Sequence, residues 1–327
     1  MSALAPDVVA APDSFKGSFA ASEVAVAIGR GVRAAGATVA ELPVADGGEG
    51  TMDALLAARG GELRGADAAD PLGRPLRARF AVLGDGSAVV EVAAASGLPL
   101  VDPDERDAWR ASSRGTGELI AAAAAAGADP ILVAAGGSAT TDGGAGALAV
   151  LDEAALRPSL VVLCDVRTPF EDAARAFGPQ KGAGRATVTR LEARLADLAA
   201  SAPRDPTGVP MTGAAGGLAG GLWASRGAEL VPGAAFVLDA AGFDAAAEAA
   251  ALVLTGEGRL DASTAAGKAV AEVAGRCRER RRPCHAIVGE DALSEPDARA
   301  LGLAAATEAS TLPAIERAAR RLAAEIG

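Results

Sequence analysis

The sequence predicts a two-lobed α/β protein in which a doubly wound, Rossmann-like parallel sheet forms one lobe and a second α/β lobe is inserted in the chain. Three observations support this fold class. Short apolar runs with the length of buried strands alternate with segments of helical spacing. The middle of the chain carries a hairpin pattern. The chain has 327 residues, half of them hydrophobic, which is enough for two domains with sizeable cores.

We expect residues 1–60 and 240–327 to form the Rossmann-like lobe, residues 61–239 to form the inserted lobe, and the active-site cleft to lie between them. The N-terminal segments alternate between strand and helix with loops between them, as a parallel α/β sheet requires. Ser22 is expected to cap the first helix. In chain order the segments are strand Val8–Ala11, loop Pro12–Ser18, helix Ser22–Ala35, strand Val39–Val44, loop Asp46–Gly48 and helix Thr51–Ala58.

The rest of the chain predicts a hairpin, further strands and helices, and two irregular stretches. On the third of these helices, Leu191, Leu195 and Leu198 share one face. In chain order the segments are hairpin strands Arg77–Leu83 and Ala88–Val92, helix Gly117–Ala126, strands Ile131–Ala134 and Leu160–Leu163, helix Thr189–Ala199, surface connection Ser201–Pro210, Gly-rich stretch Met211–Gly221, strand Leu252–Leu254, helix Ala265–Cys277, strand Pro283–Val288 and helix Leu312–Ile326.

Charge argues against a nucleic-acid partner. The net charge is −11, whereas a nucleic-acid binder needs a basic surface. The basic run Arg276–Arg282 is interpreted as the solvated C-terminal end of a helix, where cations suit the helix dipole. An acidic protein can still bind anions if it places backbone donors and a few cations locally.

Other residue counts exclude further classes. The three cysteines form no C-x-x-C pair, which indicates reduced thiols and a cytoplasmic location. The first residues lack the pattern of a signal peptide, and the longest apolar run, Leu119–Ala135, is interrupted by glycine, aspartate and proline, so no membrane association is expected. A single histidine, His285, and no tyrosine make serine-histidine mechanisms and multi-histidine metal sites unlikely candidates.

Loops that combine glycine with acidic residues follow several predicted strands. Ligands bind at the carboxyl ends of strands in open α/β sheets, and glycine lets backbone N–H groups approach phosphate oxygens there. Acidic residues in the same loops suit Mg²⁺, which prefers oxygen ligands. The loops are Asp13–Ser18, Asp46–Thr51, Gly136–Gly144 and Gly256–Asp261.

The lysines reinforce this interpretation. Only three lysines occur among 31 basic residues, and each lies beside a glycine in a predicted loop: Lys16, Lys181 and Lys268. Lysine is a compact point charge suited to phosphate. Neither a P-loop nor a G-x-G-x-x-G motif is present, so the phosphate site must have another design.

Two alternative classes share parts of the pattern. A nicotinamide-dependent oxidoreductase would also use glycine loops on an α/β sheet, but its dinucleotide fingerprint is missing. A non-catalytic ligand sensor would keep the pocket and lose the chemistry, yet all the acidic candidates are present.

These loops resemble those of the type-1 glycerate kinase family, and the resemblance runs through most of the chain. It implies ATP-dependent phosphorylation of D-glycerate, usually to 2-phosphoglycerate, by a two-lobed α/β enzyme. The segments that carry it are Ala11–Ser18, Ala45–Thr51, Ala93–Leu98, Ser112 with Gly115–Ile120, Gly136–Gly144, Cys164–Val166, Phe177–Ala183 and Thr255–Asp261.

Phosphoryl transfer needs charge neutralisation, positioning and a proton acceptor. On this hypothesis Lys16 is catalytic, and the proton acceptor is Asp165 or Asp142. The Mg²⁺ ligands are expected among Asp46 and Glu49, with Asp142 as a further candidate. Substrate-binding residues are predicted as Asp13, Ser14, Ser96, Gly97 and Thr116. Nucleotide- and phosphate-binding residues are predicted as Gly47, Gly48, Gly137, Ser138, Gly143, Lys181, Gly256, Gly258 and Lys268.

The expected cofactors are ATP and Mg²⁺, and the expected partners are small-molecule substrates, with a homodimer as one assembly that the sequence allows. The sequence leaves open which glycerate hydroxyl receives the phosphate and which other small hydroxy acids are used.

Overall fold

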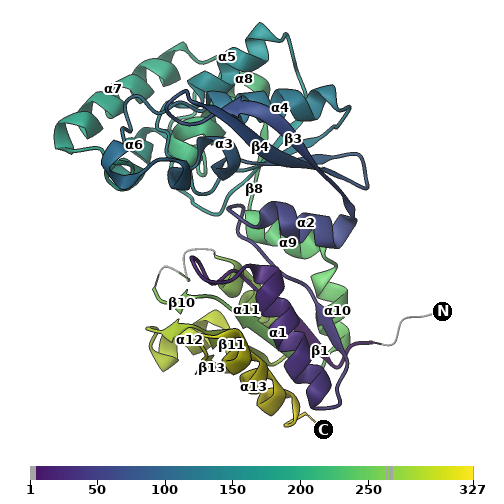
Figure 1. The fold of residues 1–327 in the computed structure, drawn as a ribbon. Coiled ribbons are helices and arrows are strands. Elements are labelled where there is room, and N and C mark those ends of the chain that lie inside the picture. The colour runs from purple at the N-terminus through teal and green to yellow at the C-terminus, as the bar shows by residue number, and fades with distance from the viewer. Residues whose placement is uncertain (1–4, 263, 265–267, 327) are drawn as a thin grey trace. The chain divides into compact units, whose positions relative to one another are not determined.

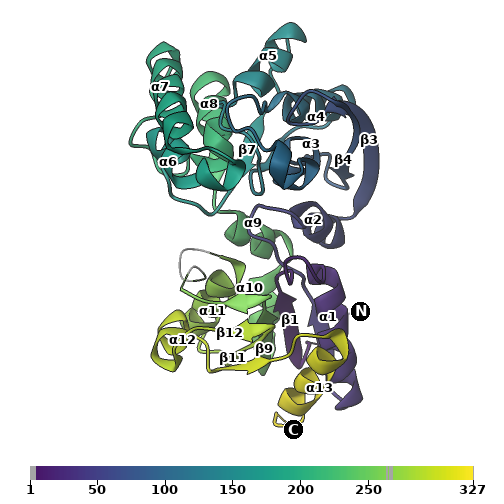
Figure 2. The ribbon, with the colours of Figure 1, turned by 60° about the vertical axis from the view of Figure 1, so that its left-hand side comes forward.

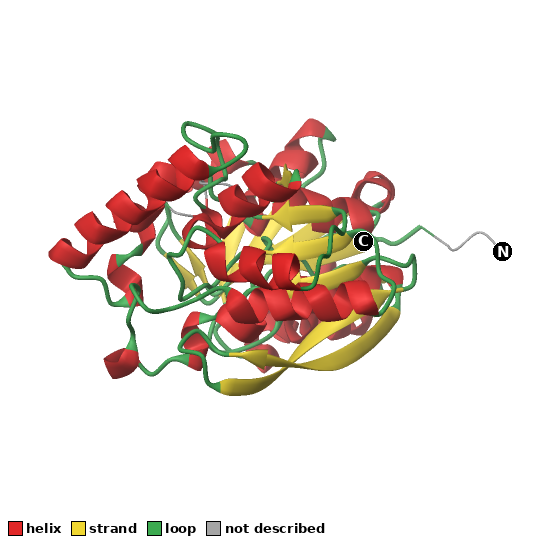
Figure 3. Cartoon of the chain, turned by 90° about the horizontal axis from the view of Figure 1, so that it is seen from above, coloured by secondary structure: helices red, strands yellow, loops and turns green. Residues whose placement is uncertain are grey.

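The computed structural model of the protein describes residues 5–262, 264 and 268–326. The chain divides into two compact units. Unit 1 consists of residues 1–46, 53–58 and 234–327, and unit 2 of residues 47–52 and 59–233. Each unit holds its own main sheet, and Figure 3 shows the strands of the chain with helices around them, so the predicted two-lobed α/β fold class is confirmed.

Unit 1 contains a sheet of five parallel strands (Figures 1 and 2). The fully buried β1 pairs on both sides, with Val8 opposite Val39 and Leu252. The predicted second strand is shorter than expected, because Pro12 has no N–H group to continue the ladder. In spatial order the strands are β13 (Ala305–Glu308), β11 (Cys284–Val288), β9 (Leu252–Gly256), β1 (Val8–Pro12) and β2 (Val39–Glu41). A separate parallel pair joins β10 (Arg259–Leu260) to β12 (Glu290–Asp291).

Helices α1 and α13 lie side by side in both ribbon views (Figures 1 and 2). Gly31 permits this contact, since a Cβ there would lie 2.2 Å from the carbonyl oxygen of Glu316. The cap prediction was wrong: α1 begins after Ala20, and Glu23 accepts the Ala20 N–H at 2.9 Å, which leaves Ser22 inside the first turn. The helices of unit 1 are α1 (Ala21–Ala34), α9 (Gly233–Ala240, whose first residue belongs to unit 2), α10 (Phe243–Ala249), α11 (Ala269–Glu279), α12 (Glu295–Leu301) and α13 (Leu312–Ala323).

Two helix predictions need adjustment. The start predicted for α11, from Ala265, lies outside the described residues, and the described helix runs from Ala269 to Glu279. The last helix ends at Ala323 and not at Ile326.

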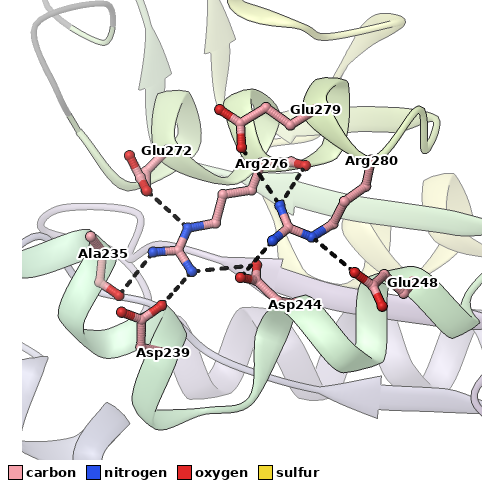
Figure 4. Close-up of polar contacts among 8 residues, drawn as sticks. All are labelled: Ala235, Asp239, Asp244, Glu248, Glu272, Arg276, Glu279 and Arg280. Atoms are coloured by element: carbon pink, nitrogen blue, oxygen red, sulfur yellow. Dashed lines mark hydrogen bonds and ion pairs between the residues drawn. The ribbon is translucent and has the colours of Figure 1, made fainter.

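The basic run at the end of α11 is not a freely solvated helix end. Arg276 donates to Asp239 on α9 at 2.5 Å and to Glu272 at 2.9 Å, and its side chain is only 13% exposed. Arg280 pairs with Asp244 on α10 at 2.6 Å. Figure 4 shows the two guanidinium groups between the acidic residues of three helices, so this part of the run holds α9, α10 and α11 together.

Unit 2 contains a mixed sheet of six strands. Its first three strands are antiparallel, which confirms the predicted hairpin, and the others are parallel. The sequence missed the first strand because most of its residues are exposed and show no buried apolar pattern. In spatial order the strands are β3 (Gly61–Ala69), β4 (Pro75–Leu83), β5 (Ala88–Glu91), β6 (Ile131–Ala134), β7 (Leu160–Leu163) and β8 (Glu229–Val231).

The predicted helices 51–58, 117–126 and 189–199 are present and longer than expected, whereas four further α-helices were not predicted from the sequence: Ala93–Ser96, Ala145–Glu153, Ala173–Phe177 and Leu218–Arg226. On α7, Leu191 and Leu195 are buried and Leu198 is partly buried, as the spacing indicated. The α-helices are α2 (Thr51–Arg59, which crosses the unit boundary), α3 (Ala93–Ser96), α4 (Arg114–Ala125), α5 (Ala145–Glu153), α6 (Ala173–Phe177), α7 (Arg185–Ser201) and α8 (Leu218–Arg226). The 3₁₀ helices cover Leu98–Leu100, Pro103–Glu105, Phe170–Asp172, Pro179–Lys181 and Ala214–Gly217.

Within the described part of the chain, no helix combines the length and apolar character that crossing a membrane requires. All three cysteines are buried and free of disulfide bonds.

Candidate functional site

In unit 1, predicted site residues gather at the carboxyl edge of the parallel sheet. Pro12 at the end of β1 lies opposite Gly256 at the end of β9, so the next residues, Asp13 and Glu257, leave neighbouring strands at the same edge. The Asp13 N–H donates to the Gly256 carbonyl at 2.8 Å. This edge therefore places an acidic residue on each of two adjacent strands.

Asp13 is a buried carboxyl group. Burial raises the pKa of Asp13 to about 7, and the negative charge of Asp46 adds to this rise. The N–H of Ser14, which donates to Asp13 Oδ1 at 2.6 Å, and the positive charge of Lys16 act in the opposite direction. Three other predicted residues, Ser14, Lys16 and Asp46, thus influence the pKa of Asp13 at this edge.

Glu257 belongs to the same cluster and was not singled out from the sequence. It is 6% exposed, and Thr264 Oγ1 donates to its carboxylate at 2.7 Å. Burial raises the pKa of Glu257, while the charges of Lys268 and Lys16 lower it. Its place directly after an apolar strand was the signal that could have identified it.

Gly258 explains how two of the predicted loops approach each other. A Cβ at Gly258 would lie 3.3 Å from the backbone nitrogen of Lys16, so a side chain there would press on the neighbouring loop. Unit 1 therefore brings together Asp13, Lys16 and Asp46 with the loop that contains Gly256 and Gly258, and Lys268 acts electrostatically on Glu257.

Unit 2 joins a second group of predicted residues. Thr116 Oγ1 donates to Ser96 Oγ at 2.8 Å, and both hydroxyl groups are fully buried. Gly97 forms a bridge with Ser138, and the Leu98 N–H donates to the Gly137 carbonyl at 2.8 Å. The residues predicted to bind substrate and those predicted to bind phosphate are therefore neighbours here.

Lys181 also forms hydrogen bonds to this group of residues. Its Nζ donates to Ser138 Oγ at 2.9 Å and to the Thr140 carbonyl at 2.6 Å. The side chain is 3% exposed, and burial lowers the pKa of Lys181 to about 7, although the charge of Asp142 opposes this. Lys181 can therefore gain a proton when an anion binds nearby.

Asp142 is held firmly inside its own loop. Its carboxylate accepts four bonds: from the N–H and Oγ of Ser113 at 2.8 Å each, and from the N–H groups of Gly144 at 3.1 Å and Gly146 at 3.2 Å. The Gly143 N–H donates to the Gly216 carbonyl at 3.1 Å, so this amide stabilises the position of the loop. These bonds fix the path of the chain into α5.

The Asp46–Thr51 loop packs against the ends of β6 and β7. The Gly136 N–H donates to the Gly47 carbonyl at 3.0 Å, and a Cβ at Gly136 would lie 2.4 Å from the Gly48 Cα. Gly47 has φ +87°, and a Cβ there would lie 2.6 Å from the Leu163 carbonyl oxygen. Close backbone packing therefore requires glycine at Gly47 and at Gly136.

Glu91 is a second residue that the sequence did not reveal. It ends β5, is 8% exposed, and its Oε1 accepts the N–H groups of Gly50 and Met52 at 2.9 Å each. It therefore holds the end of the Asp46–Thr51 loop and the first turn of α2. A carboxylate inside the apolar run Val89–Val92 was the available signal.

The other predicted acidic residues are Asp165 and Glu49. Asp165 follows β7 and accepts the N–H of Gly233 at 2.8 Å, whereas Asp142 follows β6 and has other partners. Glu49 is exposed. Among the described residues, no three His, Cys, Asp or Glu side chains are grouped to hold a metal ion by themselves.

Mg²⁺ does not require such a group, since it is usually bound through one or two carboxylates, water and phosphate oxygens. Asp13 and Asp46 fit this requirement, because the negative charge of Asp46 disfavours the ionised form of Asp13 and a cation bound between the two carboxylates would relieve this repulsion.

Comparisons with known proteins agree on one family. A family model described as the glycerate kinase family matches residues 8–159 and 151–326. Glycerate 2-kinase of Escherichia coli (strain K12) is 40% identical over 322 residues, which cover 86% of this chain and 84% of the relative. Glycerate kinase of Bacillus subtilis (strain 168) is 38% identical over 325 residues, with 86% and 84% covered. A crystal structure assigned provisionally to glycerate kinase 2 of Salmonella typhimurium LT2 matches with a TM-score of 0.85 at 35% identity and covers 98% of both chains.

Proposed function

Because the chain belongs to the glycerate kinase family, we propose that it transfers the terminal phosphoryl group of ATP to D-glycerate and forms 2-phosphoglycerate. Membership of this family makes the chain a kinase that acts on an alcohol group. The observation that carries the finer proposal is the gathering of acidic residues, lysines and glycine loops at the carboxyl edges of both sheets.

Unit 2 supplies the phosphate-binding part of the proposal. Lys181 would meet phosphate charge, with Ser138 and the backbone of Gly137 beside it. An anion near Lys181 would raise the pKa of Lys181 and restore its proton, so the attraction grows as the ligand binds. Ser96 and Thr116, whose fully buried hydroxyl groups bond to each other, would position the adjacent Gly97 backbone toward the three-carbon acid.

Unit 1 supplies the metal-binding part. Asp46 and Asp13 would hold Mg²⁺ together with phosphate oxygens, and Glu49 remains a predicted further ligand. When bound, Mg²⁺ neutralises charge on the transferring phosphoryl group. Lys16 would add a positive charge at the same loop and orient the substrate carboxylate.

The proton acceptor for the glycerate hydroxyl is assigned to Asp165. The alternative, Asp142, already accepts four donors and shapes its loop. Asp165→Asn is expected to lower kcat by about 10²–10⁴-fold with little change in the midpoint of urea unfolding. Asp142→Asn is expected to lower both activity and stability, because the amide cannot accept all four bonds. Wild-type turnover by Asp165→Asn would contradict the assignment.

The decisive experiment is a coupled assay of ADP release with D-glycerate and Mg-ATP. Product identity is read by ³¹P NMR, which distinguishes 2-phosphoglycerate from 3-phosphoglycerate. L-glycerate and buffer without acceptor serve as controls. ADP release without acceptor, or none at all, would argue against the proposal. Titration with NADH tests the oxidoreductase alternative, and glycerate binding without ADP release would support a sensor.

We also propose that the reaction takes place in the cytoplasm, since three free thiols suit a reducing compartment. A homodimer stays a prediction, which size-exclusion chromatography with light scattering checks.

A further inference from the structure

Beside α7 lies a hollow of about 480 Å³, which we name the Trp109 cavity. It is lined by Trp109 and by the face of α7 that carries Arg190, Arg194, Asp197 and Leu198. Its volume falls in the range of small-molecule sites, about 300–1,000 Å³. One aromatic ring, two guanidinium groups and an aliphatic wall therefore face the same space.

The two arginines are placed by the indole ring. The Cζ atoms of Arg190 and Arg194 lie 4.0 Å and 3.6 Å from the ring centroid of Trp109. Arg194 also donates to the Trp109 carbonyl at 2.9 Å. These contacts fix the planar groups relative to one another before any ligand arrives.

The positive charge of this wall is not matched by a close ion pair. Among the described residues, no carboxylate oxygen lies within 4.0 Å of either guanidinium. Burial lowers the pKa of Arg194, and the neighbouring charge of Arg190 lowers it further, while Asp142 and Asp107 oppose this. The lining therefore carries two guanidinium groups against one carboxylate, Asp197, and this excess of positive charge favours a ligand that brings negative charge.

The cavity adjoins the part of unit 2 that is proposed to bind phosphate. Trp109 lies in the same short segment as Arg106, whose carbonyl oxygen would be 2.5 Å from a Cβ at Gly182. Gly182 follows Lys181, which bonds to Ser138 and Thr140. A second hollow, of about 330 Å³, shares Leu198 with the Trp109 cavity and is lined by Gly143 of the same loop.

We propose that the Trp109 cavity binds the base and ribose of the nucleotide, with the purine ring against the outer planar face of Arg190 or Arg194, since these two guanidinium groups already cover the two faces of the Trp109 indole. This inference rests on the proposed function and adds the nucleoside subsite to it. Flat guanidinium and indole surfaces suit a purine, and the arginines also favour a ligand that carries phosphates. Adjacent Lys181 would then lie on the phosphate side of the same ligand.

Fluorescence tests the proposal directly, because the chain has only two tryptophans. In a Trp223→Phe variant, Trp109 is the single reporter. ATP and ADP are expected to change its emission with saturation, and adenosine is expected to compete with them. Inorganic tripolyphosphate at the same concentration is expected to have little effect. A response to tripolyphosphate alone would overturn the proposal, as would no response to ATP.

Kinetics provide an independent readout. Arg190→Ala and the milder Arg190→Gln are each expected to raise KM for ATP about 5- to 20-fold, with KM for glycerate unchanged and kcat within about twofold. Arg204→Ala is the matched control, because Arg204 makes the same kind of contact with Trp223, at 3.3 Å, outside this cavity. Equal KM values for ATP in the Arg190 variants and the wild type would refute the inference.

Different results would contradict the proposed function and the nucleoside subsite. If the wild-type enzyme releases no ADP with glycerate, the proposed function is wrong. If it turns over normally while Trp109 is silent and the Arg190 variants keep the wild-type KM for ATP, only the nucleoside subsite is wrong.

Discussion

At the scale of single residues, the proposed site contains two groups, Asp13 and Lys181, whose ionised forms are unfavourable in the ligand-free protein. Asp13 is a carboxyl group among other acids, and Lys181 is an amine in a buried position. Both raise the energy of the ligand-free protein, and both would be relieved by the ligands proposed for them. Their titration therefore links stability to function.

Asp13→Asn is expected to stabilise the ligand-free protein while lowering activity. The pKa of Asp13 is about 7 in the folded chain and has an ordinary value of 3.8, so the folded state holds a proton that the unfolded state has lost between these pH values. Wild-type stability therefore falls as pH rises from about 4 to 7. At pH 8, without Mg²⁺, urea unfolding should show the variant more stable by on the order of 2–4 kcal/mol.

The difference between Asp13→Asn and wild type should vanish near pH 4 and shrink when Mg²⁺ is added, because the cation favours the charged carboxylate. Equal stability of the two proteins at pH 8 would contradict the burial of an ionised Asp13.

Lys181 is expected to give the opposite pH dependence of stability, which the Lys181→Met variant tests. The pKa of Lys181 is about 7 in the folded chain against an ordinary 10.5, so between these values the unfolded state binds the extra proton. Wild-type stability should therefore rise with pH above 7 relative to the variant, by at most about 1.4 kcal/mol per pH unit. ATP binding at pH 7.5 should take up protons in wild type and not in Lys181→Met, which calorimetry in buffers of different ionisation enthalpy measures.

At the scale of secondary-structure elements, buried carboxylates fix the loops that carry the site. Glu91 Oε1 holds two backbone N–H groups at the start of α2. Glu91→Ala would leave both donors buried without an acceptor and should destabilise the protein by about 2–4 kcal/mol. Glu91→Gln keeps a carbonyl oxygen and should retain most of the stability, as measured by urea unfolding. Similar losses in both variants would indicate a role for the charge and not for the acceptor.

The charged network on α11 makes a comparable prediction for unit 1. Arg276→Met removes the partner of Asp239, Asp244 and Glu272 and should lower stability by about 2 kcal/mol, because like charges then remain together on three helices (Figure 4). The matched control is Arg30→Met, whose ion pair with Glu316 is well exposed and should contribute at most about 0.5 kcal/mol. A loss no greater than that of the control would show that solvent screens the network.

At the scale of the whole molecule, the carboxyl edge of the parallel strands carries predicted site residues in each of the two units. In unit 1 the residues after β1 and β9 are acidic, and in unit 2 the segments after β5 and β6 carry the hydroxyl and glycine group. The loop Asp46–Thr51 contributes Asp46 to unit 1 and its glycines to unit 2. Each unit therefore carries some of the residues that the proposed reaction requires.

The sequence by itself determined the alternation of strands and helices, because apolar periodicity and loop composition are local properties. It also indicated most of the glycine and acidic loops, since residues at strand ends follow directly from the strand pattern. It missed β3, whose side chains are largely exposed, the short strand β8 and several helices, among them α5 and α8. It also misplaced the cap of α1, where Glu23 takes the part expected of Ser22.

Only the tertiary structure decided which of these residues touch. Three contacts join segments that are 39 or more residues apart: Glu257 beside Asp13, Glu91 against the Asp46–Thr51 loop, and Lys181 against Ser138. Burial, which raises or lowers the pKa values of Asp13 and Lys181, likewise comes from distant chain segments packed around them. Such contacts depend on the order and register of strands, which local patterns do not encode.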